Sequence, residues 1–185
     1  MATKRSPYDF YPTPVDCVVK LLENETVYGN ILEPCAGDGV ICSTILQKLN
    51  NIMFIDAIEI DESHQDKLLN CGATRIFYKD ILQVDGNFLS KYDVIITNPP
   101  FSIAQEILEH ILDNVDLEET KVIMLLRLNF LGSQKRHEFW KKHLPDRIHV
   151  LSKRPSFTGQ GTDSQEYAWF VWDKNGVSKK HINVI

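Results

Sequence analysis

Hydrophobic positions along the chain change between a helical repeat and short continuous runs. Apolar residues at 15, 18, 19 and 22 lie on one helical face behind Thr13 and Pro14, which predicts a capped amphipathic helix. Helical patterns follow at 40–49, 103–111 and 133–144, and Ser102 with Gln105 predicts a capping box. Continuous apolar runs predict seven strands, at 31–33, 52–60, 75–78, 92–98, 121–128, 147–152 and 167–173.

This alternation of strands and helices is typical of an α/β fold. It predicts a doubly wound, mostly parallel seven-stranded sheet that ends in an antiparallel hairpin. We expect a single domain over 1–185, because 185 residues with 43% hydrophobic content suffice for one core. Such sheets bind ligands beyond the carboxyl ends of their strands, so the residues that follow each strand should carry the chemistry.

Composition narrows the class of protein. No apolar run reaches the roughly 18 residues needed to span a bilayer, and the amino end lacks the apolar centre of a signal peptide. Cys17, Cys35, Cys42 and Cys71 form no CxxC pair, and the six histidines show no metal-ligand spacing with them. We therefore expect a soluble, cytoplasmic protein with reduced thiols, no membrane contact and no metal.

The net charge of −5 is unevenly distributed. Residues 134–155 contain seven Lys or Arg and two acids, so this stretch carries +5 and the rest of the chain −10. A basic edge on an acidic body favours contact with a polyanion along one side, although a solvated helix face would give the same pattern. The cations are Lys135, Arg136, Lys141, Lys142, Arg147, Lys153 and Arg154.

Three successive strand ends carry residues suited to an adenosine-containing cofactor. The first is followed by EPCAGDG, in which Gly37 and Gly39 allow a tight turn, although a plain strand-to-helix turn also uses such glycines. Glu59 ends the second strand, at the spacing of a carboxylate that accepts from ribose hydroxyls. Asp80 follows the third and can accept from an adenine amino group.

The kind of cofactor follows from charge. A dinucleotide fingerprint would have a third glycine where Cys42 stands, and Asp38 would face a pyrophosphate with the wrong sign. S-adenosylmethionine carries an ammonium and a sulfonium, which suit acids such as Glu33 and Asp38. The pattern therefore favours S-adenosylmethionine over NAD.

The fourth strand runs into the tetrapeptide NPPF. The Asn98 side-chain oxygen and the Pro99 carbonyl are two acceptors that can hold the hydrogens of a planar amino group and localise its lone pair on nitrogen. The prolines fix this backbone before a substrate arrives, and Phe101 offers a face on which a base can stack. The alternative is that Asn-Pro only ends a strand.

With these motifs, nearly the whole chain resembles the S-adenosylmethionine-dependent DNA N6-adenine methyltransferases, and among them the small enzymes of phages and prophages. The resemblance implies a Rossmann-like class I methyltransferase fold, S-adenosylmethionine as cofactor, and an adenine of DNA flipped into a pocket as substrate. It also implies that Asn98, Pro99, Pro100 and Phe101 form the catalytic loop.

The same resemblance implies further site residues. The cofactor-binding set is Thr13, Pro14, Glu33, Pro34, Cys35, Ala36, Gly37, Gly39, Glu59, Ile60, Asp80, Ile81 and Asn98. The expected substrate contacts are Phe101, Phe157, Lys141, Lys142 and Arg154, with Trp140 and Arg147 as further candidates for duplex contacts. Ordinary packing would also explain Phe157 and Trp140, and Thr13 with Pro14 can also cap a helix.

The cofactor motifs precede the catalytic loop, as in the enzymes that append a separate target-recognition domain at the carboxyl end. We expect no such domain in this chain. Target recognition would then come from residues 127–165, a second subunit or a partner protein. Similar loops occur in enzymes that methylate base amino groups in RNA or glutamine amides in proteins. A catalytically silent nucleic-acid-binding module is a further alternative.

Overall fold

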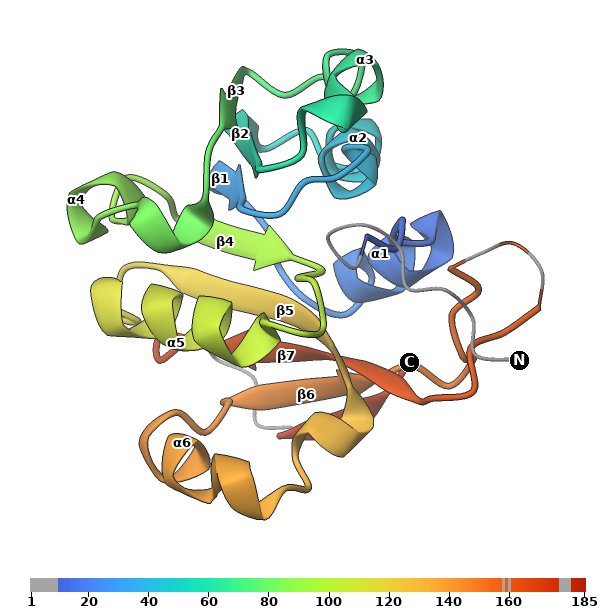
Figure 1. Ribbon diagram of the computed structural model, residues 1–185, viewed down its shortest axis with the longest axis vertical. Coiled ribbons are helices and arrows are strands. Elements are labelled where there is room, and N and C mark those ends of the chain that lie inside the picture. The colour runs from blue at the N-terminus through green and yellow to red at the C-terminus, as the bar shows by residue number, and fades with distance from the viewer. Residues whose placement is uncertain (1–9, 158, 160, 177–180) are drawn as a thin grey trace.

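A computed structural model describes residues 10–157, 159, 161–176 and 181–185 of the chain. Its strands form one eight-stranded sheet in the order β3-β2-β1-β4-β5-β7-β6-β8 (Figure 1). The first five strands in this order pair in parallel, whereas β7 runs antiparallel to both β5 and β6. The strands are β1 (Gly29–Glu33), β2 (Ile52–Glu59), β3 (Arg75–Tyr78), β4 (Val94–Thr97), β5 (Lys121–Arg127), β6 (Arg147–Val150), β7 (Tyr167–Trp172) and β8 (Ile182–Val184).

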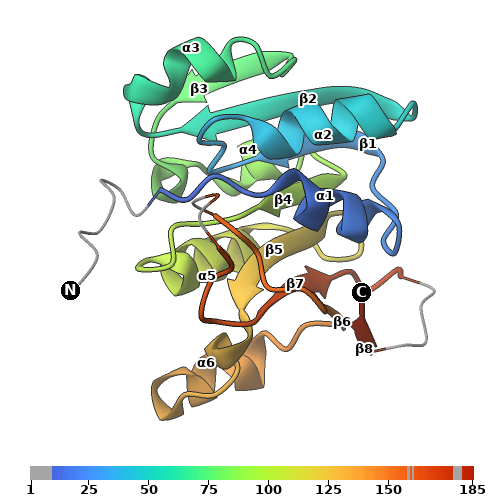
Figure 2. The ribbon, with the colours of Figure 1, turned by 90° about the vertical axis from the view of Figure 1, so that its right-hand side faces the viewer.

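Helices cover both faces of this sheet, as the alternating pattern predicts. The helices α1, α2 and α3 lie on one face, where Figure 2 shows α1 and α2 in front of the strands, and α4, α5 and α6 pack on the other. The helices are α1 (Val15–Leu22), α2 (Val40–Lys48), α3 (Gln65–Leu68), α4 (Gly86–Leu89), α5 (Ala104–Asn114) and α6 (His137–Lys142), with short 3₁₀ turns η2 (Glu62–His64), η3 (Ile81–Gln83), η4 (Leu128–Phe130) and η5 (Gln134–Arg136). Within the described residues, no helix is long and apolar enough to cross a membrane.

The continuous apolar runs are explained by burial on both faces. Successive side chains of a strand point to opposite sides, so Ile95 packs in one core while Val94 and Ile96 pack in the other. All six residues of β7 are buried in the same way. The doubly wound α/β architecture is confirmed.

The sheet has one strand more than the sequence pattern predicted. Strand β8 pairs in parallel with β6 at the edge of the sheet. It is three residues long, and both Ile182 and Val184 are largely exposed. A strand this short, with exposed apolar side chains, gives no burial pattern in the sequence.

The start of helix α1 differs from the local capping pattern. The helix begins after Pro14, which makes no side-chain hydrogen bond to it. The Thr13 hydroxyl instead contacts Asn98, as described below. A tertiary partner has taken the oxygen that the local pattern assigned to the helix.

Candidate functional site

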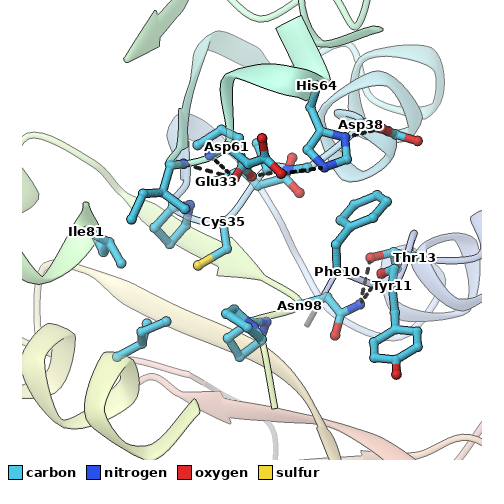
Figure 3. Close-up of a pocket in the computed structure, with 18 of the residues that line it drawn as sticks. Phe10, Tyr11, Thr13, Glu33, Cys35, Asp38, Asp61, His64, Ile81 and Asn98 are labelled. Atoms are coloured by element: carbon cyan, nitrogen blue, oxygen red, sulfur yellow. Dashed lines mark hydrogen bonds and ion pairs between the residues drawn. The ribbon is translucent and has the colours of Figure 1, made fainter. Parts of the chain in front are cut away.

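A cavity of about 820 Å³, part of it open to solvent, lies at the carboxyl ends of the parallel strands (Figure 3). Its walls come from segments far apart in sequence, because parallel strands all end at the same edge. The main lining segments are 10–13, 33–38, 59–61, 79–81 and 98–101.

The glycine-rich loop forms one wall. Gly37 has a φ of 51°, in the left-handed region, and a Cβ at this position would collide with the Phe10 ring. Its N–H donates to Glu59 Oε2 over 2.6 Å. The predicted tight turn is present, and glycine is required because the N-terminal segment packs directly on it.

Two carboxylates stand at neighbouring strand ends with their positions fixed. Glu59 Oε1 accepts from the N–H groups of Ile60 and Asp61, each over 2.9 Å, in addition to the bond from Gly37. Asp80 Oδ1 accepts from the Leu82 N–H over 2.9 Å. A carboxylate has about four acceptor positions, so both side chains retain capacity toward the cavity.

Glu33 is a buried acid in the same cavity. Its side chain accepts from the Cys42 N–H over 3.0 Å, and the residue is almost inaccessible to solvent. Burial raises the pKa of Glu33 well above its usual range, and the hydrogen bond from Cys42 opposes that effect only in part. Because burial disfavours the ionised form of this acid, a cationic ligand would stabilise its charged form.

Glu33→Gln is expected to stabilise the ligand-free protein at neutral and alkaline pH. The folded state raises the pKa of this acid, so above the unfolded-state pKa the folded protein binds more protons than the unfolded chain, and stability falls as pH rises. The stability advantage of the variant over the wild type should therefore grow with pH from about pH 4 upwards. Thermal unfolding of both proteins at pH 4, 6 and 8 measures this difference. A variant less stable than the wild type at pH 8 would contradict the raised pKa of Glu33.

Asp38 lines the cavity, but its charge is already compensated. Its two oxygens contact His64 Nδ1 over 2.6 Å and Lys67 Nζ over 2.7 Å. The His64 ring in turn lies 4.1 Å from the ring of Phe10. Sequence reasoning missed His64, because no motif marks its position in η2, after the end of β2.

Asn98 has an oriented amide at the end of β4. Its Nδ2 donates to the Tyr11 carbonyl over 3.3 Å and to Thr13 Oγ1 over 3.1 Å (Figure 3). A carbonyl can only accept, which fixes the nitrogen on that side. The Oδ1 atom is buried, and no hydrogen-bond partner for it lies among the described residues. A free acceptor therefore stands at the loop predicted to hold a substrate amino group.

An aromatic group adjoins this amide. The ring centres of Phe101 and Tyr11 lie 6.0 Å apart, at an interplanar angle of 23°. The guanidinium of Arg127 lies 4.6 Å from the centre of the Phe101 ring. Phe157 packs against the same ring at 6.2 Å and is 6% exposed, so its side chain is part of the core. Sequence reasoning missed Arg127, although it ends strand β5 at the same edge.

The structure does not bring Lys141 and Lys142 to the cavity. Lys142 pairs with Asp113 over 2.7 Å, near the C-terminal end of α5. Helix α5 leads from β4 to the parallel strand β5, so it starts at the cavity edge and ends at the opposite edge (Figure 1). Lys141 pairs with Glu138 on the exposed side of α6.

The fold places the other candidate residues of the basic stretch in different environments. Arg147 is 3% exposed and pairs with Glu25 and Asp173, so the expected duplex contact is wrong for this side chain. Trp140 is buried, as its packing interpretation required. Arg154 is exposed on the segment that carries Phe157, at the cavity edge.

Residues 15–120, more than half of the chain, match the sequence profile of a family described as methyltransferase small domain. Comparison with curated protein sequences gives no match.

Solved structures share the fold at low sequence identity. A candidate RNA methyltransferase from Pyrococcus horikoshii has a TM-score of 0.69 at 15% identity, over 92% of this chain and 91% of that one. A candidate class I S-adenosylmethionine-dependent methyltransferase from Listeria monocytogenes has 0.58 at 16%, over 99% and 67%. A precorrin-6y C5,15-methyltransferase from Geobacter metallireducens has 0.58 at 12%, over 88% and 93%. The described activities differ, so this likeness concerns the fold and does not select a substrate.

Proposed function

The chain belongs to the methyltransferase small domain family and depends on S-adenosylmethionine, and from that premise we propose that it methylates the N6 amino group of adenine in DNA. The observation that carries the proposal is the buried Oδ1 of Asn98, an acceptor without a partner in the part of the chain that the structure describes. The bound cofactor supplies an electrophilic methyl group. The protein's task is then to hold an amino nitrogen and make it a better nucleophile.

The cavity residues fit this cofactor by charge and by hydrogen-bonding capacity. Glu59 and Asp80 offer fixed acceptors for the hydroxyl and amino groups of adenosine. Glu33 is a buried acid that no cationic side chain of the described residues contacts, which suits a positively charged ligand. We propose these three side chains, with the glycine-rich loop, as the cofactor site.

Asn98 and Pro99 act on the substrate. In the proposed complex, Asn98 Oδ1 and the Pro99 carbonyl each accept one hydrogen of the exocyclic amino group. This arrangement opposes delocalisation of the nitrogen lone pair into the ring and orients the pair toward the methyl donor. Because the Asn98 amide is already oriented by Tyr11 and Thr13, little reorganisation is needed when the substrate arrives.

The aromatic group favours a nucleobase over a glutamine amide. Tyr11 and Phe101 present nearly parallel rings beside Asn98, an arrangement suited to a flat aromatic substrate extruded from a stack. An acyclic amide would gain little from these faces. Recognition of a longer target would come from the loops that follow β5 and β6, where Arg154 is exposed, or from a second subunit or partner protein.

Labelled S-adenosylmethionine tests the substrate class directly. The protein is incubated in turn with unmethylated DNA, with RNA and with protein extract, and we expect label in DNA as N6-methyladenine on nucleoside analysis. Asn98→Ala protein serves as the control for contaminating activity. Label confined to RNA or to protein would overturn the DNA assignment and retain methyl transfer.

Phe101→Ala is expected to weaken the hold on the extruded base by about 1–3 kcal/mol of lost stacking. Extrusion costs less from a mismatch or from a single strand, so the defect should be partly relieved on those substrates. Single-turnover rates on matched, mismatched and single-stranded DNA measure the effect. An equal defect on all three would show that Phe101 does not support base extrusion.

A further inference from the structure

We propose that Thr13 is a positioning residue whose hydroxyl fixes the Asn98 amide so that Oδ1 faces the substrate. The proposal rests on the proposed role of Asn98 as acceptor. Thr13 is 9% exposed and lies 85 positions before Asn98, yet its Oγ1 accepts from Asn98 Nδ2 over 3.1 Å (Figure 3). The contact is therefore a product of the tertiary fold.

The two anchors of Asn98 together satisfy its amide nitrogen. An asparagine amide has two N–H donors, and here one acceptor is the Tyr11 carbonyl and the other is Thr13 Oγ1. Neither hydrogen then needs to face the cavity, where it would oppose the hydrogens of a substrate amino group. Without the Thr13 hydroxyl, one partly buried N–H would lack an acceptor and the amide would turn to find another.

The local sequence fixes both acceptors in advance. Tyr11 precedes Pro12, Thr13 precedes Pro14, and Asn98 itself precedes Pro99. A residue before proline is largely restricted to extended backbone conformations, so all three residues have limited freedom. The YPTP stretch is thus a rigid segment in which the Tyr11 carbonyl and the Thr13 hydroxyl both accept from the Asn98 amide.

This role differs from the cofactor contact that the family resemblance implied for Thr13. A residue that only binds cofactor would change cofactor affinity and leave the rate at saturation intact. A residue that acts through Asn98 would change the rate at saturation and leave cofactor affinity intact. The two assignments therefore separate in a measurement of affinity and rate on the same variants.

The test compares Thr13→Val, which keeps the shape and removes the hydroxyl, with Thr13→Ser, which keeps the hydroxyl. At saturating cofactor and methyl acceptor, we expect Thr13→Val to slow single-turnover transfer by about 3- to 10-fold, the loss of one hydrogen bond. Thr13→Ser should stay within about 2-fold of the wild type, and calorimetric cofactor affinity should stay within about 2-fold for both. Thr13→Ala provides a second hydroxyl-free variant.

A double-mutant cycle asks whether Thr13 acts through Asn98. Thr13→Val should cause no further slowing in an Asn98→Ala background, because the amide it positions is gone. An equal slowing in both backgrounds would overturn the proposal. So would a loss of cofactor affinity with a wild-type rate at saturation.

A measurement without substrate separates this inference from the proposed function. In the cofactor-free protein with isotope-labelled asparagine, the Asn98 side-chain hydrogens should exchange with solvent at least about 5-fold faster in Thr13→Val than in Thr13→Ser. Faster exchange in a protein that does not methylate DNA would retain the positioning role and reject the DNA assignment. Equal exchange in the two variants would reject the positioning role, whatever the substrate.

Discussion

Asn98→Ala is expected to slow methyl transfer by about 10² to 10³, the cost of removing one preorganised polar group from a reacting centre. The wild-type Oδ1 is buried and has no hydrogen-bond partner within residues 10–157, 159, 161–176 and 181–185, so its capacity is available to the substrate. Single-turnover transfer at saturating cofactor and DNA measures the step itself. Cofactor affinity should change little, because Glu33, Glu59 and Asp80 lie on other strand ends.

Asn114→Ala is a suitable control for this experiment. Asn114 is an exposed asparagine at the end of α5, at the edge opposite the cavity, and it donates to the His110 carbonyl over 2.8 Å. Its loss should leave the transfer rate within about 2-fold of the wild type, as expected for one exposed hydrogen bond. A wild-type rate for Asn98→Ala would overturn the mechanism, whereas equal slowing of both variants would indicate a general disturbance of the fold.

The convergence of the site residues could be predicted from the sequence because it follows from topology. Glu33, Glu59, Asp80 and Asn98 are spread over 66 positions, yet all lie at or just after the ends of parallel strands and line one cavity. The apolar runs located those strands, and the rule that parallel strands end at one edge then brought the four residues together.

The connection between Thr13 and Asn98 could not be predicted in the same way. Thr-Pro before an amphipathic helix is a normal capping pattern, and the local interpretation competes with any distant partner. Which partner takes the hydroxyl depends on how the N-terminal segment crosses the cavity edge. A single sequence contains no signal for that path.

The basic stretch shows a different limit of sequence reasoning. A count of charges gives their sum but not the edge of the sheet on which they lie. Lys142 is at the end of a helix that returns to the edge opposite the cavity, and Arg147 starts the next strand. Arg147 therefore became part of a buried ion cluster, far from the substrate side.

That cluster consists of five side chains at the edge opposite the cavity. Glu25 accepts from Arg147 over 2.9 Å and from Lys121 over 2.9 Å, and lies 3.1 Å from His149. Asp173 contacts the same two cations, at 2.7 Å and 3.3 Å. Burial alone would raise the pKa of Glu25, but hydrogen bonds from His149, Arg147 and Lys121 hold it well below its usual range.

Glu25→Gln is expected to lower the free energy of unfolding by about 3–5 kcal/mol at pH 7, because it leaves two buried cations with one carboxylate. The folded state depresses the pKa of Glu25, so its contribution is present above the unfolded-state pKa of about 4.3 and is lost as pH falls below it. The deficit of the variant in unfolding free energy should therefore shrink in acid.

Glu23→Gln is the matched control, because Glu23 is exposed and pairs with Lys20 on the surface. This substitution should lower the free energy of unfolding by less than about 1 kcal/mol. Denaturant unfolding at pH 7 and pH 4 measures both variants, and a Glu25→Gln deficit no larger than that of Glu23→Gln would mean that the buried cluster does not stabilise the fold.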